Sequence, residues 1–121
     1  MSKLEIMVVD DQPAICKEVA SYLKNEYIVH AFKDAIGAIK HLENNPVDLI
    51  LLDYYMPEMT GFEALLSIQH NKAISDVPVI FLTAETSDRM EHEMRQRGAN
   101  DFLVKPIDPD KLRRCIKKYL S

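Results

Sequence analysis

Five short runs of successive apolar residues are spaced along the chain. Four of them cover residues 5–10, 27–32, 47–53 and 77–83, and a shorter fifth run covers 101–105. Because apolar residues fill consecutive positions rather than every second one, both faces of each run must be covered by other parts of the chain. We therefore predict strands of a parallel sheet that lies between two layers of helices.

The intervals between these runs carry apolar residues at helical spacing. The stripes consist of Ile15, Val19, Tyr22 and Leu23; Ile36, Ile39 and Leu42; Phe62, Leu65 and Leu66; Met90 and Met94; and Leu112, Cys115, Ile116, Tyr119 and Leu120. A spacing of three to four residues puts each set on one face of a helix. Strands that alternate with such helices predict an α/β fold of the (βα)5 type, doubly wound, with right-handed crossovers.

Residues at the expected helix ends agree with this arrangement. Asp108 comes directly before Pro109, a pair typical of an N-cap followed by the first helical position. Gly98 is suited to end the fourth helix, and Pro46 interrupts the second.

Composition and charge restrict the class of protein. With 121 residues, 47% of them hydrophobic and 28% charged, we expect one domain over residues 1–121. The formal net charge of −4 disfavours a nucleic-acid surface, and no apolar run approaches the ~20 residues needed to cross a bilayer. The first residues lack the layout of a signal peptide. We therefore expect a cytoplasmic protein that binds neither nucleic acid nor membrane.

Polar side chains stand where the predicted strands end. The first run ends in Asp10 and Asp11, the third in Asp53, the fourth in Thr83 and the fifth in Lys105. The carboxyl ends of parallel strands share one edge of the sheet, where ligands bind in open α/β sheets. We therefore expect these five side chains to meet.

Three carboxylates at one edge repel one another, by about 4 kcal/mol for each pair about 4 Å apart at an effective dielectric constant near 20. Lys105 can neutralise one charge, and a hard divalent cation can offset the rest. Mg²⁺ typically uses one or two carboxylates, water and a phosphate oxygen. The alternative is that each aspartate only caps the helix after its strand. That alternative accounts for a single aspartate, but not for three acids, a threonine and a lysine at matching strand ends.

Four segments carry a resemblance to a known family. They are VVDD, LLDYYMPEMTG, LTA and DFLVKP, and they occur in this order at the predicted strand ends. With them, the whole chain resembles a receiver domain of the two-component response regulators and is similar to the small single-domain chemotaxis regulators. The resemblance implies a flavodoxin-like sheet with strand order 2-1-3-4-5.

The resemblance also implies an acceptor and a metal. Asp53 is the implied phosphoacceptor, which takes a phosphoryl group from a phosphohistidine of a sensor histidine kinase or a phosphotransfer protein. Mg²⁺ is the implied cofactor, held by Asp10, Asp11, Asp53 and the backbone carbonyl of Tyr55. Such a transfer needs positioning and charge neutralisation more than covalent help.

The same resemblance assigns residues that bind the phosphoryl group and set its lifetime. Lys105, the Thr83 hydroxyl and the Ala84 backbone N–H are expected to bind its oxygens. Tyr55 and Glu85 are expected to shape the access of water, and we expect the bulky Tyr55 to prolong the signal. Packing within the loop is the alternative role of the tyrosine pair at 54–55. The protein is then a phosphoacceptor with slow self-dephosphorylation rather than an enzyme.

The implied switch and output involve the end of the chain. When Thr83 turns toward the phosphoryl group, Phe102 is expected to swing inward; the alternative is a plain core aromatic. Pro106 allows a cis peptide bond with Lys105. A downstream protein is expected on the face formed by the fourth helix, the fifth strand and the fifth helix. The protein is expected to be a monomer or to dimerise on phosphorylation.

Two rival functions differ in the residues that they need. A phosphohydrolase of the haloacid-dehalogenase type also uses a nucleophilic aspartate, but it needs a second acid two residues later, where this chain has Tyr55. A phosphorylation-independent receiver-like scaffold has no need for the complete set of Asp11, Asp53, Thr83 and Lys105. The sequence fits both a stand-alone regulator and a part of a longer protein.

Overall fold

Strands and helices alternate along the whole described chain. The structure is a computed structural model that describes residues 3–120; residues 1, 2 and 121 of the expected domain lie outside the described residues. The strands are β1 (Glu5–Val9), β2 (Ile28–Phe32), β3 (Leu49–Asp53), β4 (Val79–Thr83) and β5 (Asp101–Val104). The helices are α1 (Pro13–Leu23), α2 (Ala35–Leu42), α3 (Gly61–Gln69), α4 (Asp88–Gln96) and α5 (Pro109–Leu120).

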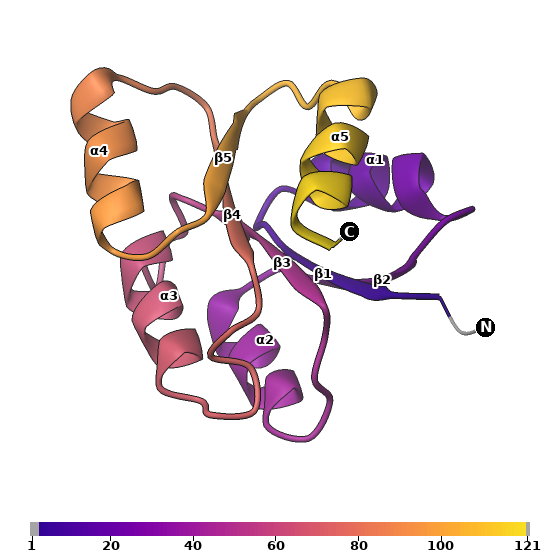
Figure 1. Cartoon of the computed structure of the whole chain (residues 1–121), viewed down its shortest axis with the longest axis horizontal. Coiled ribbons are helices and arrows are strands. Elements are labelled where there is room, and N and C mark those ends of the chain that lie inside the picture. Colours follow the sequence, from indigo (N-terminus) through magenta and orange to yellow (C-terminus); the bar gives the residue numbers. More distant parts are fainter. Residues whose placement is uncertain (1–2, 121) are drawn as a thin grey trace.

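The five strands form one parallel sheet in the order β2-β1-β3-β4-β5. Helices α1 and α5 cover one face of the sheet, and α2, α3 and α4 cover the other (Figure 1). The predicted (βα)5 fold and the strand order implied by the resemblance are confirmed.

The core is divided into two layers by the sheet. In β1, Met7 and Val9 point into the layer beneath α2, α3 and α4, whereas Ile6 and Val8 point into the layer beneath α1 and α5. Successive side chains of a strand point to opposite faces, so a strand covered on both sides must be apolar throughout. This is why consecutive apolar residues predicted the strands correctly.

The prediction that every strand is covered on both faces is wrong for the two edge strands, β2 and β5; in β5, Val104 exposes 41% of its surface. The three central strands are buried almost throughout, but β2 lies at the edge of the sheet, and Ile28 exposes 43% of its surface. An edge strand has a neighbour on one side only, so the helices cover it less completely.

Two of the helical stripes are also placed differently from the prediction. The buried residues of α2 are Ala35, Ala38 and Leu42, while Ile36 exposes 51% of its surface. In α3, Leu66 is exposed as well. Ala35, Ala38 and Leu42 are spaced three and four residues apart and so share the buried face of α2, and Ile36 lies outside this face.

The helix ends follow the expected chemistry. Asp108 accepts a hydrogen bond from the backbone N–H of Lys111 at 2.9 Å, and Gly98 has a φ of +100°, which suits the end of α4. Thr60 and Glu63 form a capping box at the start of α3. This cap fixes the chain as it leaves the loop after β3.

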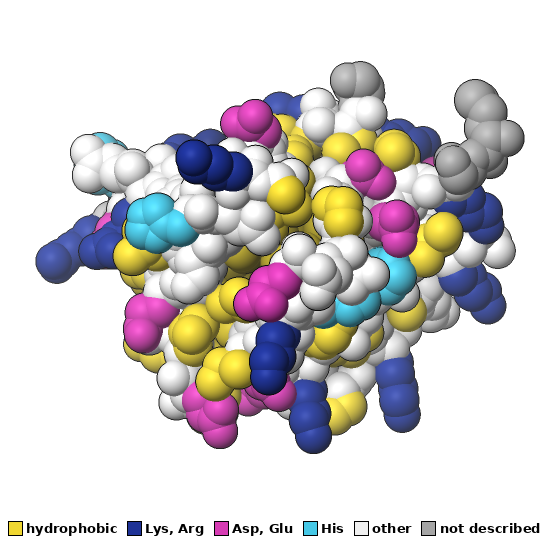
Figure 2. All heavy atoms as spheres, turned by 90° about the horizontal axis from the view of Figure 1, so that it is seen from below, with side chains coloured by type: hydrophobic (Ala, Val, Ile, Leu, Met, Phe, Trp, Pro, Cys, Tyr) yellow, Lys and Arg dark blue, Asp and Glu magenta, His cyan; other side chains and the backbone are white. Residues whose placement is uncertain are grey.

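Charged side chains of both signs are spread over one face of the molecule. On the face seen from below α2 and α3, Figure 2 shows basic and acidic side chains interspersed with apolar ones rather than gathered by sign. Among residues 3–120, we find no helix with the length and apolar character needed to span a membrane.

Candidate functional site

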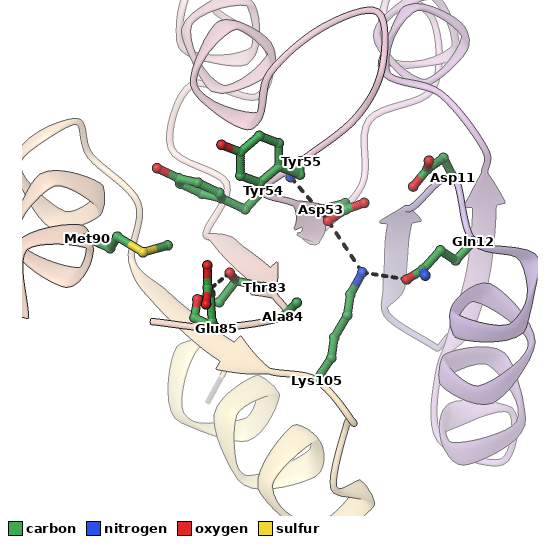
Figure 3. Close-up of a pocket in the computed structure, with 10 residues that line it drawn as sticks. All are labelled: Asp11, Gln12, Asp53, Tyr54, Tyr55, Thr83, Ala84, Glu85, Met90 and Lys105. Carbon is green, nitrogen blue, oxygen red and sulfur yellow. Dashed lines mark hydrogen bonds and ion pairs between the residues drawn. The ribbon is translucent and has the colours of Figure 1, made fainter. Parts of the chain in front are cut away.

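The carboxyl ends of four strands surround a cleft of about 500 Å³. Asp11 follows β1, Asp53 and Thr83 are the last residues of β3 and β4, and Lys105 follows β5. All four side chains line this cleft (Figure 3). Each is close to the site because a strand of the parallel sheet ends at the same edge, at or just before it.

Three carboxylates converge at one side of the cleft. Asp10, Asp11 and Asp53 each have an oxygen within 4.8 Å of the other two. Asp10 is fully buried, Asp53 exposes 4% of its surface, and Asp11 is exposed. A hard cation such as Mg²⁺ binds oxygen ligands of this kind, so the donor set fits such an ion.

Asp10 does not cap a helix by its side chain. Its Oδ1 accepts a hydrogen bond from the backbone N–H of Gln12 at 2.9 Å, and Gln12 is the N-cap residue of α1. Its Oδ2 faces the ammonium of Lys105 at 2.8 Å. The carboxylate of Asp10 therefore stabilises the loop after β1 and binds the ammonium of Lys105.

Lys105 links the two buried carboxylates. Its Nζ lies 2.8 Å from Asp10 Oδ2 and 3.4 Å from Asp53 Oδ1, and its side chain is only 14% exposed. Burial lowers the pKa of Lys105, but the hydrogen bond and the charge of Asp10 and the charge of Asp53 outweigh burial, so that the pKa rises overall. The ammonium therefore stays charged at neutral pH.

Asp53 is poised between its ionised and neutral forms. Burial and the nearby charge of Asp10 raise its pKa from 3.8 to about 7, although Lys105 and the backbone N–H of Tyr55 oppose the rise. That N–H lies 3.3 Å from Asp53 Oδ1. A further positive charge at the site would favour the ionised form, which is the nucleophilic one.

The hydroxyl of Thr83 points away from Asp53 in this structure. Its Oγ1 donates a hydrogen bond to the carbonyl of Glu85 at 2.6 Å (Figure 3). Ala84 and Glu85 are exposed at the rim of the cleft. The hydroxyl can donate to a ligand in the cleft only after this bond is broken.

Phe102 lies on β5, beside Phe81 of β4 in the sheet register. Its side chain is partly buried and packs against the core layer beneath α2, α3 and α4. The peptide bond between Lys105 and Pro106 is cis, the isomer that Pro106 allows.

The two tyrosines after Asp53 have different surroundings. Tyr54 packs edge-on against Phe62 and Phe81, with ring centroids 5.3 and 5.6 Å away. Tyr55 exposes 78% of its surface at the cleft. Packing explains Tyr54, whereas Tyr55 is free to contact a molecule that enters.

Sequence reasoning missed three residues of the cleft, namely Gln12, Tyr54 and Met90. Gln12 is the most closely involved, because its Oε1 accepts a hydrogen bond from Lys105 Nζ at 3.0 Å. The one signal in the sequence for a role in the cleft was its position directly after Asp11. The partner of its side chain, 93 residues away in the sequence, becomes apparent only in the folded chain.

Comparison with known proteins agrees with this geometry. Residues 6–117 match the family model of the response regulator receiver domain. The chain is similar to the chemotaxis protein CheY4 of Vibrio cholerae, with a TM-score of 0.93 and 30% identity over 98% of this chain and 100% of that one.

Two further similar proteins are a receiver domain solved with magnesium and a relative that is longer than this chain. One is the receiver domain of the sensor histidine kinase PA1611 from Pseudomonas aeruginosa, solved with a magnesium ion in the active site cleft; the TM-score is 0.88, with 29% identity over 98% of both chains. The other is a probable cyclic di-GMP phosphodiesterase of Vibrio cholerae, 33% identical over all 121 residues of this chain. The chain spans 27% of the length of that relative.

The chain therefore belongs to the response regulator receiver domain family. It is a phosphoacceptor signalling domain of the two-component type. Neither the scaffold nor the phosphohydrolase alternative finds support in these comparisons.

Proposed function

We propose that Asp53 is the residue that accepts the phosphoryl group. The observation that carries this proposal is the position of Lys105, whose ammonium contacts both Asp10 and Asp53 at the edge where three carboxylates converge. One incoming phosphoryl group can therefore reach Asp53 as nucleophile, the neighbouring acids, and the ammonium of Lys105. Asp53 is at the centre of this group of side chains.

The reaction is a transfer from a phosphohistidine to a carboxylate. An oxygen of Asp53 attacks phosphorus, the P–N bond breaks, and its electron pair stays on the imidazole of the donor. Phosphoryl transfer depends mainly on positioning and on neutralising charge at the phosphoryl oxygens. Lys105 supplies one cation, and the Thr83 hydroxyl and the Ala84 backbone N–H supply two neutral donors.

Mg²⁺ is the proposed cofactor. The carboxylates of Asp10, Asp11 and Asp53 and the backbone carbonyl of Tyr55 would hold it, with one of Asp10 and Asp11 acting through water. When bound, the ion supplies positive charge that offsets the repulsion between these acids and the phosphoryl oxygens. The magnesium in the similar PA1611 domain supports this assignment.

Phosphorylation is proposed to act through Thr83. To reach a phosphoryl oxygen, its hydroxyl must leave the carbonyl of Glu85, to which it now donates. The side chain then vacates space that Phe102, partly buried on β5, can fill. Such a local exchange of contacts is how phosphorylation switches a surface.

The product is an acyl phosphate, which the domain loses slowly by hydrolysis. We assign the control of this lifetime to Tyr55 and Glu85, both exposed beside the cleft. The chain itself is then a phosphoacceptor with slow self-dephosphorylation and no other enzymatic activity.

The proposed partners follow from this reaction. The donor is a sensor histidine kinase or a histidine phosphotransfer protein, and a downstream protein binds the face of α4, β5 and α5. We infer that residues 1–121 form a single receiver domain that works in the cytoplasm without contacting nucleic acid or membrane. It is a monomer or dimerises on phosphorylation.

Chemical trapping tests the acceptor. The protein is treated with acetyl phosphate and Mg²⁺, the acyl phosphate is reduced with borohydride, and the modified peptide is sequenced by mass spectrometry. The expected result is conversion of residue 53 to homoserine. Modification at another aspartate, or labelling that persists in Asp53→Asn, would refute the assignment.

A further inference from the structure

Gln12 reaches across the cleft to Lys105. Its Oε1 lies 3.0 Å from Lys105 Nζ, and Figure 3 shows the two side chains meeting beside Asp53. An ammonium has no acceptor, so the oxygen of the amide, and not its nitrogen, must face it. The contact joins the start of α1 to the loop after β5.

Among the described residues, the contact with Lys105 is the only hydrogen bond that the side chain of Gln12 makes. Gln12 is the N-cap of α1, but its side chain makes no capping hydrogen bond. Its backbone is fixed independently, because its N–H donates to Asp10 Oδ1 at 2.9 Å and its carbonyl accepts from Ile15 at 3.0 Å. The amide is thus held by a rigid backbone and free to hold Lys105.

Three acceptors surround the ammonium of Lys105: Gln12 and Asp53 accept hydrogen bonds from it, and Asp10 forms an ion pair with it. An ammonium has three N–H groups, and Nζ faces Asp10 at 2.8 Å, Gln12 at 3.0 Å and Asp53 at 3.4 Å. The two short contacts come from the loop after β1, and the long one comes from the proposed acceptor. The N–H that faces Asp53 is therefore the one most easily given to a phosphoryl oxygen.

We propose that Gln12 is a positioning residue for phosphoryl transfer. Together with Asp10 it holds the Lys105 ammonium so that one N–H points to the reacting carboxylate. This inference rests on the function proposed above, with Asp53 as acceptor. Without Gln12, the ammonium would keep only its two carboxylate partners, Asp10 and Asp53, and the donor to the phosphoryl group would lose one of the contacts that direct it.

The neutrality of the amide is part of this role. The cleft already contains three carboxylates within 4.8 Å of one another. A fourth carboxylate at residue 12 would hold the ammonium equally well but would repel the phosphoryl donor, which is itself an anion. Glutamine provides the acceptor without the charge.

Two variants of nearly the same size separate these effects. Gln12→Met keeps the length of the side chain and removes the acceptor, whereas Gln12→Glu keeps an acceptor and adds a charge. Because Gln12 is exposed, both variants should fold as the wild type does. The first measurement is NMR of the Lys105 ammonium without metal or phosphoryl donor, which reports its hydrogen exchange whatever the acceptor residue is.

We expect faster exchange of the ammonium protons in Gln12→Met and wild-type behaviour in Gln12→Glu. The second measurement is the rate of phosphorylation by acetyl phosphate at low concentration. It should fall about fivefold in Gln12→Met, the effect of losing one hydrogen bond, with Mg²⁺ affinity unchanged. In Gln12→Glu the rate should also fall, but recover as salt screens the added charge.

A double-mutant cycle with Lys105→Met completes the test. If Gln12 acts through Lys105, Gln12→Met should have no further effect on the rate in that background. Unchanged ammonium exchange and an unchanged rate in Gln12→Met would overturn the inference. A wild-type protein that acetyl phosphate leaves unmodified would instead refute the proposed function, while the ammonium measurement would still decide whether Gln12 holds Lys105.

Discussion

Replacing Asp53 by asparagine should make the protein more stable at neutral pH in the absence of divalent cations. The native fold keeps this carboxyl at 4% exposure beside Asp10, and its pKa rises to about 7. Folding therefore disfavours the ionised form. Asparagine has almost the same shape, retains an acceptor for the backbone N–H of Tyr55, and carries no charge.

The expected size follows from the pKa. A rise from 3.8 to about 7 corresponds to about 4 kcal/mol against the ionised form, at about 1.4 kcal/mol for each pH unit. The buried amide of asparagine still loses its hydration, and this offsets part of the gain. We expect Asp53→Asn to raise the free energy of unfolding by about 2 kcal/mol at about pH 8.

The gain should depend on pH in a defined direction. The unfolded carboxyl releases its proton near its ordinary pKa of 3.8, whereas the folded carboxyl keeps its proton up to about 7. Between these values the native state binds more protons, so the wild type loses stability as the pH rises. Below about pH 4 both states of the wild type are protonated, and the advantage of the variant should vanish.

Urea unfolding in the presence of EDTA measures both effects. Asp76→Asn removes one exposed carboxylate of the same charge and is the matched control, with an expected change within about 0.5 kcal/mol. Equal stabilities of wild type and Asp53→Asn at about pH 8, or a difference of the same size at about pH 4, would refute this reasoning. Added Mg²⁺ should stabilise the wild type more than the variant, because it binds the ionised acid.

Three further predictions concern two other residues of the site and the packing of α3. Lys105→Met leaves two buried carboxylates without their cation and should lower the free energy of unfolding by about 3 kcal/mol at neutral pH, which urea unfolding measures; an equally stable variant would contradict the pairing. Tyr55→Asn should admit water and shorten the lifetime of the acyl phosphate, timed by loss of the phosphorylated mass; an unchanged or longer lifetime counts against a shielding role. In Gly61→Ala, the added Cβ would lie 2.6 Å from Phe81 Cε1, and thermal unfolding should show a loss of about 1–3 kcal/mol.

Much of the fold could be predicted because the sheet is covered on both faces. A central strand such as β3 is buried throughout, and consecutive apolar residues are the direct mark of that environment. Burial at the edge is less complete, so β2 was predicted to be more covered than it is. The face of α2 was misjudged because alanines, which are weak signals in a hydrophobic stripe, form its buried side.

The candidate site could be predicted as far as the strand ends determine it. The carboxyl ends of parallel strands meet at one edge, so Asp53, Thr83 and Lys105 were assigned to one cleft without coordinates. The hydrogen bond from Thr83 to Glu85 depends on a side-chain rotamer, and the bond between Gln12 and Lys105 depends on how two distant loops approach. Neither leaves a pattern in the sequence.

A crystal structure of the protein with beryllofluoride and Mg²⁺ tests most directly whether these side chains form one metal-dependent phosphoryl site. We expect beryllium bonded to Asp53, one metal ion ligated by Asp11 and Asp53, and fluorides in contact with the Thr83 hydroxyl and the Lys105 ammonium. Beryllofluoride bound away from Asp53, or a metal ion that does not contact the acids of this cleft, would contradict the proposed site.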